Sequence, residues 1–367
     1  MSKARQLADL GNVYDDGALS HRNLIINGDH RISQRGTSAV TVTTSASYRA
    51  VDRWKSDIDG SSGHDWSHEQ STDAPTGFGY SSKITVVTSG TQPTTAATNH
   101  QLYQLLEKQD VERLAWGTSD AKTVTFSFYV KSSVTGDYGI RFIHYGSSTT
   151  PVYNTHYTIN TANTWERKTI TVTGPTTGGI TSTANSQALI VEFKLGCDTT
   201  REGQSGYQAW ETTNTQATKV GTVYLPATSG ATWFVTGCQL EIGDTETPFE
   251  HRPYGDELAR CQRYYQIWTN NSGEYGAVAT GLSNAVATFA RMTVPLKQEM
   301  RAAPSASYSN LKGYDGVNVI TPSSFTPYSV ANNFAFDMAG SGITANRGAV
   351  AFIGTAAGSY FALDAEL

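Results

Sequence analysis

Short runs of alternating β-branched and polar residues, separated by turn clusters, are the feature that most constrains the fold. Residues 40–44, Val-Thr-Val-Thr-Thr, alternate with period two, and β-branched side chains suit a pleated surface. Further strands are predicted at residues 23–28, 83–88, 123–131, 138–145, 156–159, 167–173, 188–195, 220–225 and 232–241. Clusters such as residues 60–63 and 176–179 supply the turns. Many alternating strands without long helices between them favour a sandwich or jelly roll.

A second region of strand character begins after Pro248. It opens with one predicted helix at residues 256–267, where Leu258, Cys261 and Tyr265 share a face. Strands are then expected at residues 276–280, 285–294, 305–308, 317–320, 333–338, 349–353 and 358–367. The sequence therefore predicts an all-β chain, with a jelly-roll sandwich at residues 23–250 and a linking helix plus a smaller C-terminal β domain at residues 251–367. Residues 100–114 fit either a helix or a strand.

Residues 1–22 form a separate piece of sequence. Ala4, Leu7, Ala8 and Leu10 make one short apolar helical stripe, and Gly11-Asn12 follows as a stop signal. About three helical turns are not stable alone. We therefore expect this helical anchor segment to dock on the body of the protein, on a partner or on its own copies.

Composition excludes several functional classes. The 27 Lys and Arg residues face 32 Asp and Glu residues, giving a net charge of −5 without a basic cluster, which disfavours nucleic acid as a partner. No segment reaches the ~18 apolar residues that span a bilayer, and the first ten residues contain no secretory apolar region. We therefore expect synthesis in a cytoplasm and no membrane insertion. The three cysteines, Cys197, Cys238 and Cys261, fit neither a zinc pattern nor a disulfide framework and are expected as buried thiols.

An ordered series of motifs resembles a domain of bacteriophage virion proteins found in tail fibres and related appendages. The motifs are residues 23–28, 34–37, 50–54, 126–132, 163–168, 236–243, 247–252 and 257–265, an ordered series that extends over roughly residues 23–268. Residues 2–5 resemble the attachment end of marine-phage fibre proteins, and residues 300–304 and 364–367 resemble the companion C-terminal β domain. Within these motifs we expect Trp54, Phe126, Phe128 and Trp165 to pack in the core, and Arg53 and Arg252 to be buried and hydrogen-bonded.

The resemblance implies a fold similar to carbohydrate-binding modules and a place in the virion, after assembly in the host cytoplasm. It implies a tail fibre or fibre-like component that attaches to other virion proteins by its N-terminus and binds host-surface polysaccharide. A homotrimer would make weak sugar sites effective through avidity. A purely structural adaptor or decoration protein is the alternative. The resemblance also implies a structural calcium ion, with oxygen ligands from Asn27, Asp29, Glu241 and Asp244. The alternative is that these are surface residues that bind no ion. No other cofactor is expected.

Sugar recognition uses aromatic faces and polar side chains, so aromatic residues outside the core strands are the candidates. These are Trp66, Tyr145, Tyr153, Tyr207 and Trp210. The alternative is that they are loop residues that fasten the loops to the sheet.

The sequence offers weak support for an enzyme. His64 and His68 are four residues apart, but on a strand they would lie about 13 Å apart, too far to bind one metal ion. A polysaccharide depolymerase would need paired carboxylates in a cleft, and Glu192, Glu211, Glu241 and Asp198 carry no distinguishing pattern. We therefore expect a binding protein without catalytic residues.

Overall fold

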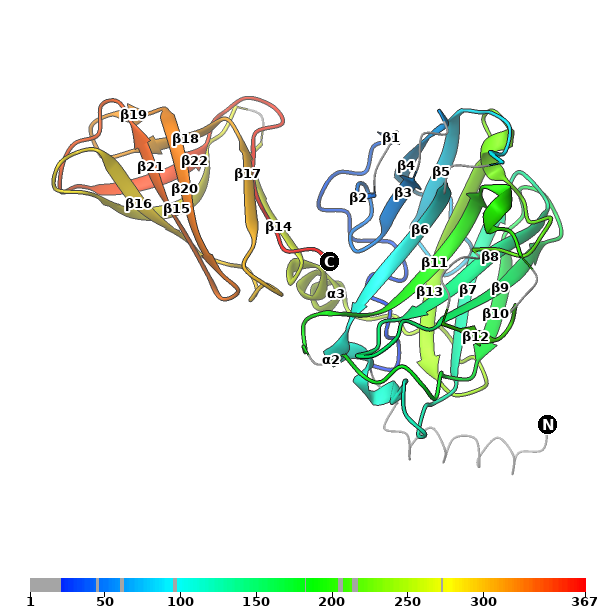
Figure 1. Cartoon of the computed structure of the whole chain (residues 1–367). Helices are drawn as coiled ribbons and strands as arrows, with labels where there is room; N and C mark the ends of the chain where they lie inside the picture. The colour runs from blue at the N-terminus through cyan, green and yellow to red at the C-terminus, as the bar shows by residue number, and fades with distance from the viewer. Residues whose placement is uncertain are drawn as a thin grey trace. The chain divides into compact units, whose positions relative to one another are not determined.

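The described part of the chain forms two compact units, one ending at Pro253 and the other spanning Tyr254–Leu367 (Figure 1). The computed structural model describes residues 21–43, 46–59, 63–94, 98–181, 183–203, 207–212, 217–271 and 273–367. Most of their regular structure is strand, so the prediction of an all-β chain is confirmed. Within these ranges no helix is long and apolar enough to cross a membrane. Ala4, Leu7, Ala8 and Leu10 of the expected anchor lie outside the described residues.

Two antiparallel sheets make up the first unit. The six-stranded sheet has the order β1 (Val40–Val42), β4 (Asp65–Ser71), β5 (Ser81–Thr88), β13 (Thr232–Ile242), β7 (Val124–Ser132) and β10 (Glu166–Val172). The seven-stranded sheet has the order β12 (Trp210–Glu211), β9 (Val152–Ile159), β8 (Gly136–His144), β11 (Gln187–Cys197), β6 (Asn99–Glu107), β3 (Lys55–Asp59) and β2 (Ser47–Tyr48).

Strand pairing in this unit is nested. β8 pairs with β9, β7 with β10, β6 with β11 and β5 with β13, and successive pairs alternate between the two sheets. A long antiparallel ribbon that winds in this way between two packed sheets is a jelly roll. The predicted jelly-roll fold is therefore confirmed by the strand order.

Aromatic side chains fill the space between the sheets. The Phe193 ring of β11 lies 5.0 Å from the Phe128 ring of β7 and 5.2 Å from the Trp233 ring of β13, measured between ring centroids. Trp54, Phe126 and Phe128 are at most 1% exposed, as expected for core residues. Burying one such ring contributes on the order of 2–3 kcal/mol. Trp165 instead lies against Phe234 and under the ammonium group of Lys131, with its indole nitrogen 3.1 Å from Asp73 Oδ1.

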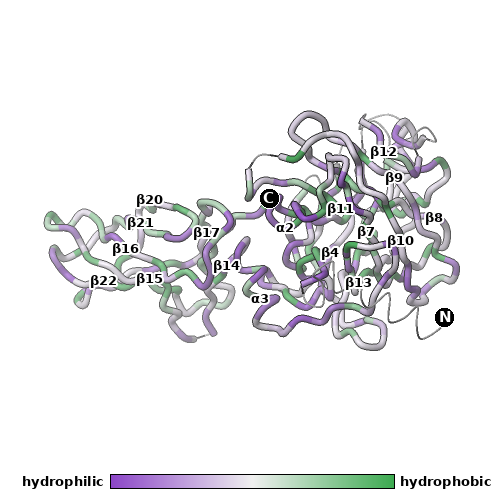
Figure 2. Tube along the Cα trace, turned by 90° about the horizontal axis from the view of Figure 1, so that it is seen from below, coloured by the Kyte–Doolittle hydropathy of each residue, from purple (hydrophilic) through white to green (hydrophobic). Residues whose placement is uncertain are grey.

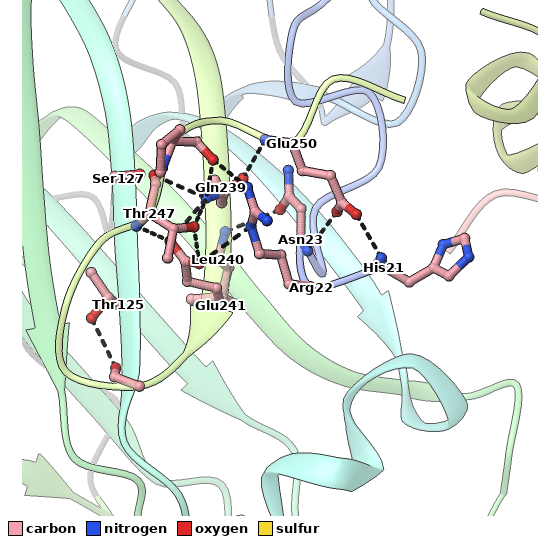
Figure 3. Close-up of polar contacts among 12 residues, drawn as sticks. His21, Arg22, Asn23, Thr125, Ser127, Gln239, Leu240, Glu241, Thr247 and Glu250 are labelled. Atoms are coloured by element: carbon pink, nitrogen blue, oxygen red, sulfur yellow. Dashed lines mark hydrogen bonds and ion pairs between the residues drawn. The ribbon is translucent and has the colours of Figure 1, made fainter. Parts of the chain in front are cut away.

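The first apolar run, residues 23–28, is not a strand in the structure but a turn-rich segment that lies along β13. Leu24 N donates to Leu240 O at 2.9 Å, and Cys238 N donates to Gly28 O at 2.9 Å. A Cβ atom at Gly28 would collide with the Cys238 carbonyl oxygen, so the close approach requires glycine. Figure 3 shows the polar contacts where this segment meets β13 and residues 247–250. There Glu250 accepts hydrogen bonds from the backbone amides of His21 and Asn23.

Arg252 fastens this junction from the following segment. It is 7% exposed and donates from Nη1 to Ile25 O at 3.1 Å and from Nη2 to Asn23 O. Arg53 is fully buried and donates to Leu105 O at 2.6 Å. Both arginines therefore have the structural role that the motifs predict.

Two further sequence predictions differ from the structure. Residues 220–225 form no strand; they lead into the short 3₁₀ helix η3 (Leu225–Ala227), which contains Pro226 at its start. Residues 100–114, which fit either a helix or a strand, form both. The strand β6 (Asn99–Glu107) comes first, and the short helices α2 (Lys108–Val111) and η1 (Glu112–Leu114) follow it.

The second unit opens with α3 (Tyr254–Gln262) and contains two sheets. The three-stranded sheet has the order β14 (Tyr265–Thr269), β23 (Tyr360–Asp364) and β17 (Ser305–Ser309). The seven-stranded sheet has the order β19 (Val319–Ile320), β18 (Leu311–Tyr314), β22 (Gly348–Ile353), β15 (Gly276–Ser283), β16 (Phe289–Val294), β21 (Asn333–Gly340) and β20 (Pro322–Val330). Figure 2 shows hydrophobic and hydrophilic residues interspersed along the strands of both units, as expected for sheets with one face in a core.

The predicted helix is present but shorter than expected. It ends at Gln262, and Tyr265 belongs to β14, where it pairs with Asp364 of β23. Tyr265, Ile267 and Trp268 have side chains that favour strands, so the apolar run continues past the helix in a different conformation. Pairing with β23 favours a strand here over a continuation of the helix to residue 267.

Candidate functional site

The outer face of the seven-stranded sheet in the first unit carries polar side chains on several neighbouring strands. On β11, Phe193 points into the core, so Glu192 and Lys194 occupy the other face. Glu192 is paired in register with Tyr103 of β6 on one side and Arg141 of β8 on the other. We call this surface the polar face, defined by Asp57, Asn99, Gln101, Tyr103, Arg141, Tyr145, Asn154, His156, Glu192 and Lys194.

Glu192 lies between two cations at the centre of the polar face. Its Oε2 atom is 3.1 Å from Lys194 Nζ and 3.5 Å from Arg141 Nη1. The side chains of all three residues are at most 5% exposed. Charges so well shielded from water interact strongly and are costly to leave without partners. The cluster therefore holds two positive charges around one carboxylate.

Lys194 connects this cluster to the neighbouring strands. Its ammonium group donates to Asn99 Oδ1 at 3.2 Å and to Gln101 Oε1, and Gln101 Nε2 donates to Asp57 Oδ2 at 3.0 Å. Burial lowers the pKa of Lys194, and the charge of Glu192 opposes that shift. The network thus crosses β11, β6 and β3 in one line of donors and acceptors.

Tyrosines border the cluster. Tyr103 is 8% exposed, and its pKa is raised by burial and by the charges of Asp57 and Glu192. Tyr145, directly after β8, is half-buried, and its pKa is raised by burial and by Glu192. Lys55 Nζ lies 5.9 Å from the Tyr103 ring centroid. Both phenols therefore stay protonated and can donate hydrogen bonds.

Tyr207, Thr218 and Lys219 lie at the other end of the polar face. Tyr207 OH and His156 Nδ1 share a hydrogen bond, and their ring centroids are 5.5 Å apart. Lys219 Nζ lies 2.7 Å from Asp137 Oδ2. A Cβ atom at Gly139 would be 2.8 Å from Thr218 Cγ2, so this glycine allows Thr218 to approach the sheet. The same position is 2.9 Å from Lys194 Cβ, so Thr218 lies beside the Lys194 end of the network.

The structure separates the five aromatic residues that were predicted to bind sugar. Tyr145 and Tyr207 lie at the polar face. Tyr153 and Trp210 pack together at a centroid distance of 5.5 Å against the hydrophobic core, and Trp210 Nε1 donates to Thr173 O at 2.6 Å. Trp66 requires a correction: it is 1% exposed because it points into the core from β4, and its indole nitrogen donates to Ser56 Oγ at 3.0 Å.

The four residues proposed as calcium ligands have other partners. Asn27 Oδ1 accepts from Ile32 N at 3.0 Å, and Asp29 Oδ2 lies 3.1 Å from Arg31 Nε. Both carboxylate oxygens of Glu241 accept hydrogen bonds from Thr247. Asp244 is exposed, and its Oδ1 accepts from Thr245 at 3.1 Å. Each of these residues therefore has a partner within the protein, and a calcium ion held by them stays a prediction.

His64 bonds to the Tyr224 hydroxyl at 2.7 Å, whereas His68 bonds to Ser82 Oγ at 3.1 Å, so the two histidines have different surroundings. The described residues contain no group of three or more His, Cys, Asp or Glu side chains placed to hold one ion. Cys197, Cys238 and Cys261 are all buried and are not joined in a disulfide, as predicted.

Sequence reasoning missed the cluster at the centre of the polar face. Arg141, Glu192 and Lys194 stand at alternate positions within two predicted strands, which was the available signal. Their partner Gln101 lies in residues 100–114, whose conformation was ambiguous, and Asn99 lies directly before that segment. The pairing of β6, β8 and β11 brings residues from about 40 to 95 positions apart into one network.

No protein-family description and no curated protein matches the chain. Similar solved structures include a protein described as sugar-binding from Bacteroides thetaiotaomicron, with 11% identity and a TM-score of 0.35 over 60% of this chain and 100% of that one. An enzymatically active domain of tailspike protein 4 from bacteriophage CBA120 has 10% identity and a TM-score of 0.31; the match covers 61% of this chain and 22% of that one.

A tandem pair of family 22 carbohydrate-binding modules from Paenibacillus barcinonensis has 11% identity and a TM-score of 0.28, with 91% of this chain and 98% of that one covered. At such TM-scores these likenesses add nothing to the evidence for a function. The assignment of the first unit as a jelly roll rests on its strand order.

Proposed function

We propose that this protein is a bacteriophage tail fibre or fibre-like virion component that binds a host-surface glycan through the polar face. The observation that carries the glycan-binding part is the array of charged, amide and phenol groups on β6, β8 and β11, with Tyr145 and Tyr207 at its borders. Sugars present closely spaced hydroxyl groups and apolar ring faces, which such groups can bind.

The chemistry of the polar face supports binding rather than hydrolysis. A glycosidase needs two carboxyl groups about 5–10 Å apart, one on each side of the scissile bond. Glu192 is instead engaged by Arg141 and Lys194, and Asp57 accepts a hydrogen bond from Gln101. These carboxylates organise the donors around them. We propose no catalytic residue in this protein.

The virion assignment is supported by the series of sequence motifs between residues 23 and 268. In this proposal residues 1–20 attach the chain to other virion proteins, and both β units face outward. Several copies, three in our proposal, present the polar face together, which makes weak glycan sites effective.

A glycan-array experiment with the full chain tests the proposal. Wild-type protein is expected to bind host-type polysaccharides, and Tyr145→Ala and Tyr207→Ala are each expected to weaken binding at least about fivefold, as loss of one ring contact would. Tyr275→Ala is the matched control, since Tyr275 is 69% exposed in the second unit. Absence of wild-type binding to every glycan, with the protein folded, would refute the proposal.

The alternative function, a structural role in the virion, is supported by a surface of the second unit. The outer face of its seven-stranded sheet carries a row formed by Val319, Tyr314, Val350 and, further along, Tyr328. These side chains are between 36% and 63% exposed. Neighbouring exposed apolar side chains on one sheet face are typical of surfaces that associate. This row supports a purely structural adaptor or decoration protein.

Oligomeric state separates the two functions. If the protein is a structural adaptor, changing Tyr314 to Asp and Val350 to Thr should abolish the self-association that sedimentation measures. Neither the wild-type protein nor this double variant should then bind a glycan. If the protein is a glycan-binding fibre component, the wild-type protein and the double variant should have the same glycan affinity per site.

A further inference from the structure

Arg141 has one hydrogen-bonding edge that the protein leaves open. Its Nη1 atom contacts Glu192 at 3.5 Å, but Nε and Nη2 are buried and have no hydrogen-bond partner among the described residues. Buried polar groups in folded proteins are nearly always paired. Arg252, by contrast, uses both Nη atoms on backbone carbonyls.

The open edge has the geometry that holds a carboxylate. Within the same chain, Arg291 uses the corresponding pair of atoms: Nε lies 2.7 Å from Asp337 Oδ1, and Nη2 lies 2.8 Å from Asp337 Oδ2. The two parallel N–H groups of this edge match the two oxygens of a carboxylate. In Arg141 the same edge is free.

The charge of the cluster formed by Arg141, Glu192 and Lys194 favours an anion at this position. Arg141 and Lys194 flank Glu192, so the cluster carries two positive charges and one negative charge. Lys194 is already bonded to Glu192, Asn99 and Gln101. The unused donors therefore belong to Arg141, and an added carboxylate would balance the charge of the cluster.

We infer that the glycan bound at the polar face carries a carboxylate, as uronic and sialic acids do, and that the Nε and Nη2 atoms of Arg141 bind it. This inference rests on the proposed function. Tyr145 follows Arg141 by four positions, comes directly after β8 on the same face of the sheet, and is half-buried. In this inference the Tyr145 ring turns aside to admit the sugar and packs on it, while Asn154, opposite Arg141 in register, binds a hydroxyl group.

Matched pairs of glycans test the inference with the full chain. Hexagalacturonate is compared with its carboxyl-reduced form, and a sialylated lactose with lactose, by titration calorimetry. At least one carboxylated member should bind 10- to 100-fold more tightly than its neutral counterpart, the range expected for a charge-assisted bidentate pair. The pair that shows the difference identifies the sugar class. Arg141→Lys keeps the charge but lacks the two-pronged edge and should remove most of the preference.

Arg291→Gln is the control for loss of charge, since it removes an exposed arginine in the second unit and should leave the preference unchanged. Equal binding of carboxylated and neutral members would overturn the inference and leave the proposed function intact. Binding of no glycan at all would overturn both. If Arg141→Lys does not fold, the comparison of paired glycans on the wild-type protein still tests whether the bound glycan carries a carboxylate.

Discussion

His100 lies in the core of the first unit against the rings of Trp66 and Tyr224, at centroid distances of 5.7 and 5.4 Å. Among the described residues neither of its ring nitrogens has a hydrogen-bond partner. Burial, followed by the charges of His64 and Lys194, lowers its pKa to about 3. His68 is fully buried as well, and burial, with a smaller effect from Arg49, lowers its pKa to about 3.

These histidines predict loss of stability in acid. In the unfolded chain a histidine binds its proton near pH 6.5, whereas the folded chain does so only near pH 3, so the unfolded state binds more protons between these values. The contribution of these neutral histidines to the free energy of unfolding is complete above about pH 6.5 and is lost as the pH falls toward about 3. Urea unfolding at several pH values should show this slope.

His100→Gln is expected to reduce the proton uptake on unfolding between pH 6 and 4 by about one. The variant is expected to be less stable at every pH because the core is altered, but the pH dependence of the free energy of unfolding is the diagnostic quantity. His251→Gln, at an exposed position, is the control. An unchanged slope in His100→Gln would show that this histidine does not titrate differently in the two states.

At the scale of elements, the connection between β9 and β10 depends on one carboxylate. Glu166 accepts from Asn160 N at 2.9 Å, from Thr161 N at 2.8 Å and from Asn160 Nδ2 at 2.9 Å, and Lys168 Nζ lies 2.5 Å away. Burial alone would raise the pKa of Glu166, but these bonds, that with Lys168 foremost, lower it to about 2. The carboxylate thus fixes the turn that returns the chain to the other sheet.

Glu166→Ala is expected to lower the free energy of unfolding by about 1–3 kcal/mol at pH 7, because the turn amides lose their acceptor. Since the pKa is lowered in the folded state, the difference from wild type should shrink as the pH falls from about 4.5 toward 2. Urea unfolding at pH 7 and pH 3 measures both values. A difference that is the same at the two pH values would contradict an ionised acceptor.

Strands with one face in the core could be predicted from the sequence, because one-sided burial imposes the period of two. β5, β7, β8, β10, β11 and β13 lie close to their predicted positions. β3 and β4 were missed because their sequences, Lys-Ser-Asp-Ile-Asp and Asp-Trp-Ser-His-Glu-Gln-Ser, are mostly polar. Ser56 and His68 are nevertheless fully buried, and such burial becomes visible only with the partner strands in place.

The candidate site could be predicted only in part for the same reason. Tyr145 and Tyr207 were identified as aromatic residues outside the strand cores. The Arg141–Glu192–Lys194 cluster depends on the register between β8, β11 and β6, which no local pattern specifies. Trp66 was misassigned because its polar neighbours indicate a loop, although its strand turns the indole inward.

At the scale of the whole molecule, the N-terminal segment and the first unit can be divided between residues 20 and 21. Glu250 accepts from His21 N at 2.5 Å and from Asn23 N at 2.9 Å, and Arg113 donates to His21 O at 2.8 Å. His21 and Asn23 are therefore part of the folded unit. The expected boundary after residue 22 would remove some of these bonds.

Deletion of residues 1–20 should leave the free energy of unfolding of the remaining chain within about 0.5 kcal/mol of wild type, while abolishing incorporation into particles. Deletion of residues 1–23 should be clearly less stable, since Asn23 also bonds to Cys238 O and Leu240 N. Urea unfolding and analysis of purified particles measure the two effects. Incorporation of the chain lacking residues 1–20 would place the attachment site elsewhere.

The central claim is that the polar face binds a glycan, and a crystal structure of the full chain with a bound oligosaccharide tests it most directly. The account predicts sugar density over β6, β8 and β11, in contact with Tyr145 and with a carboxylate on Nε and Nη2 of Arg141. Sugar bound only to the six-stranded sheet or to the second unit, with the polar face unchanged, would contradict it.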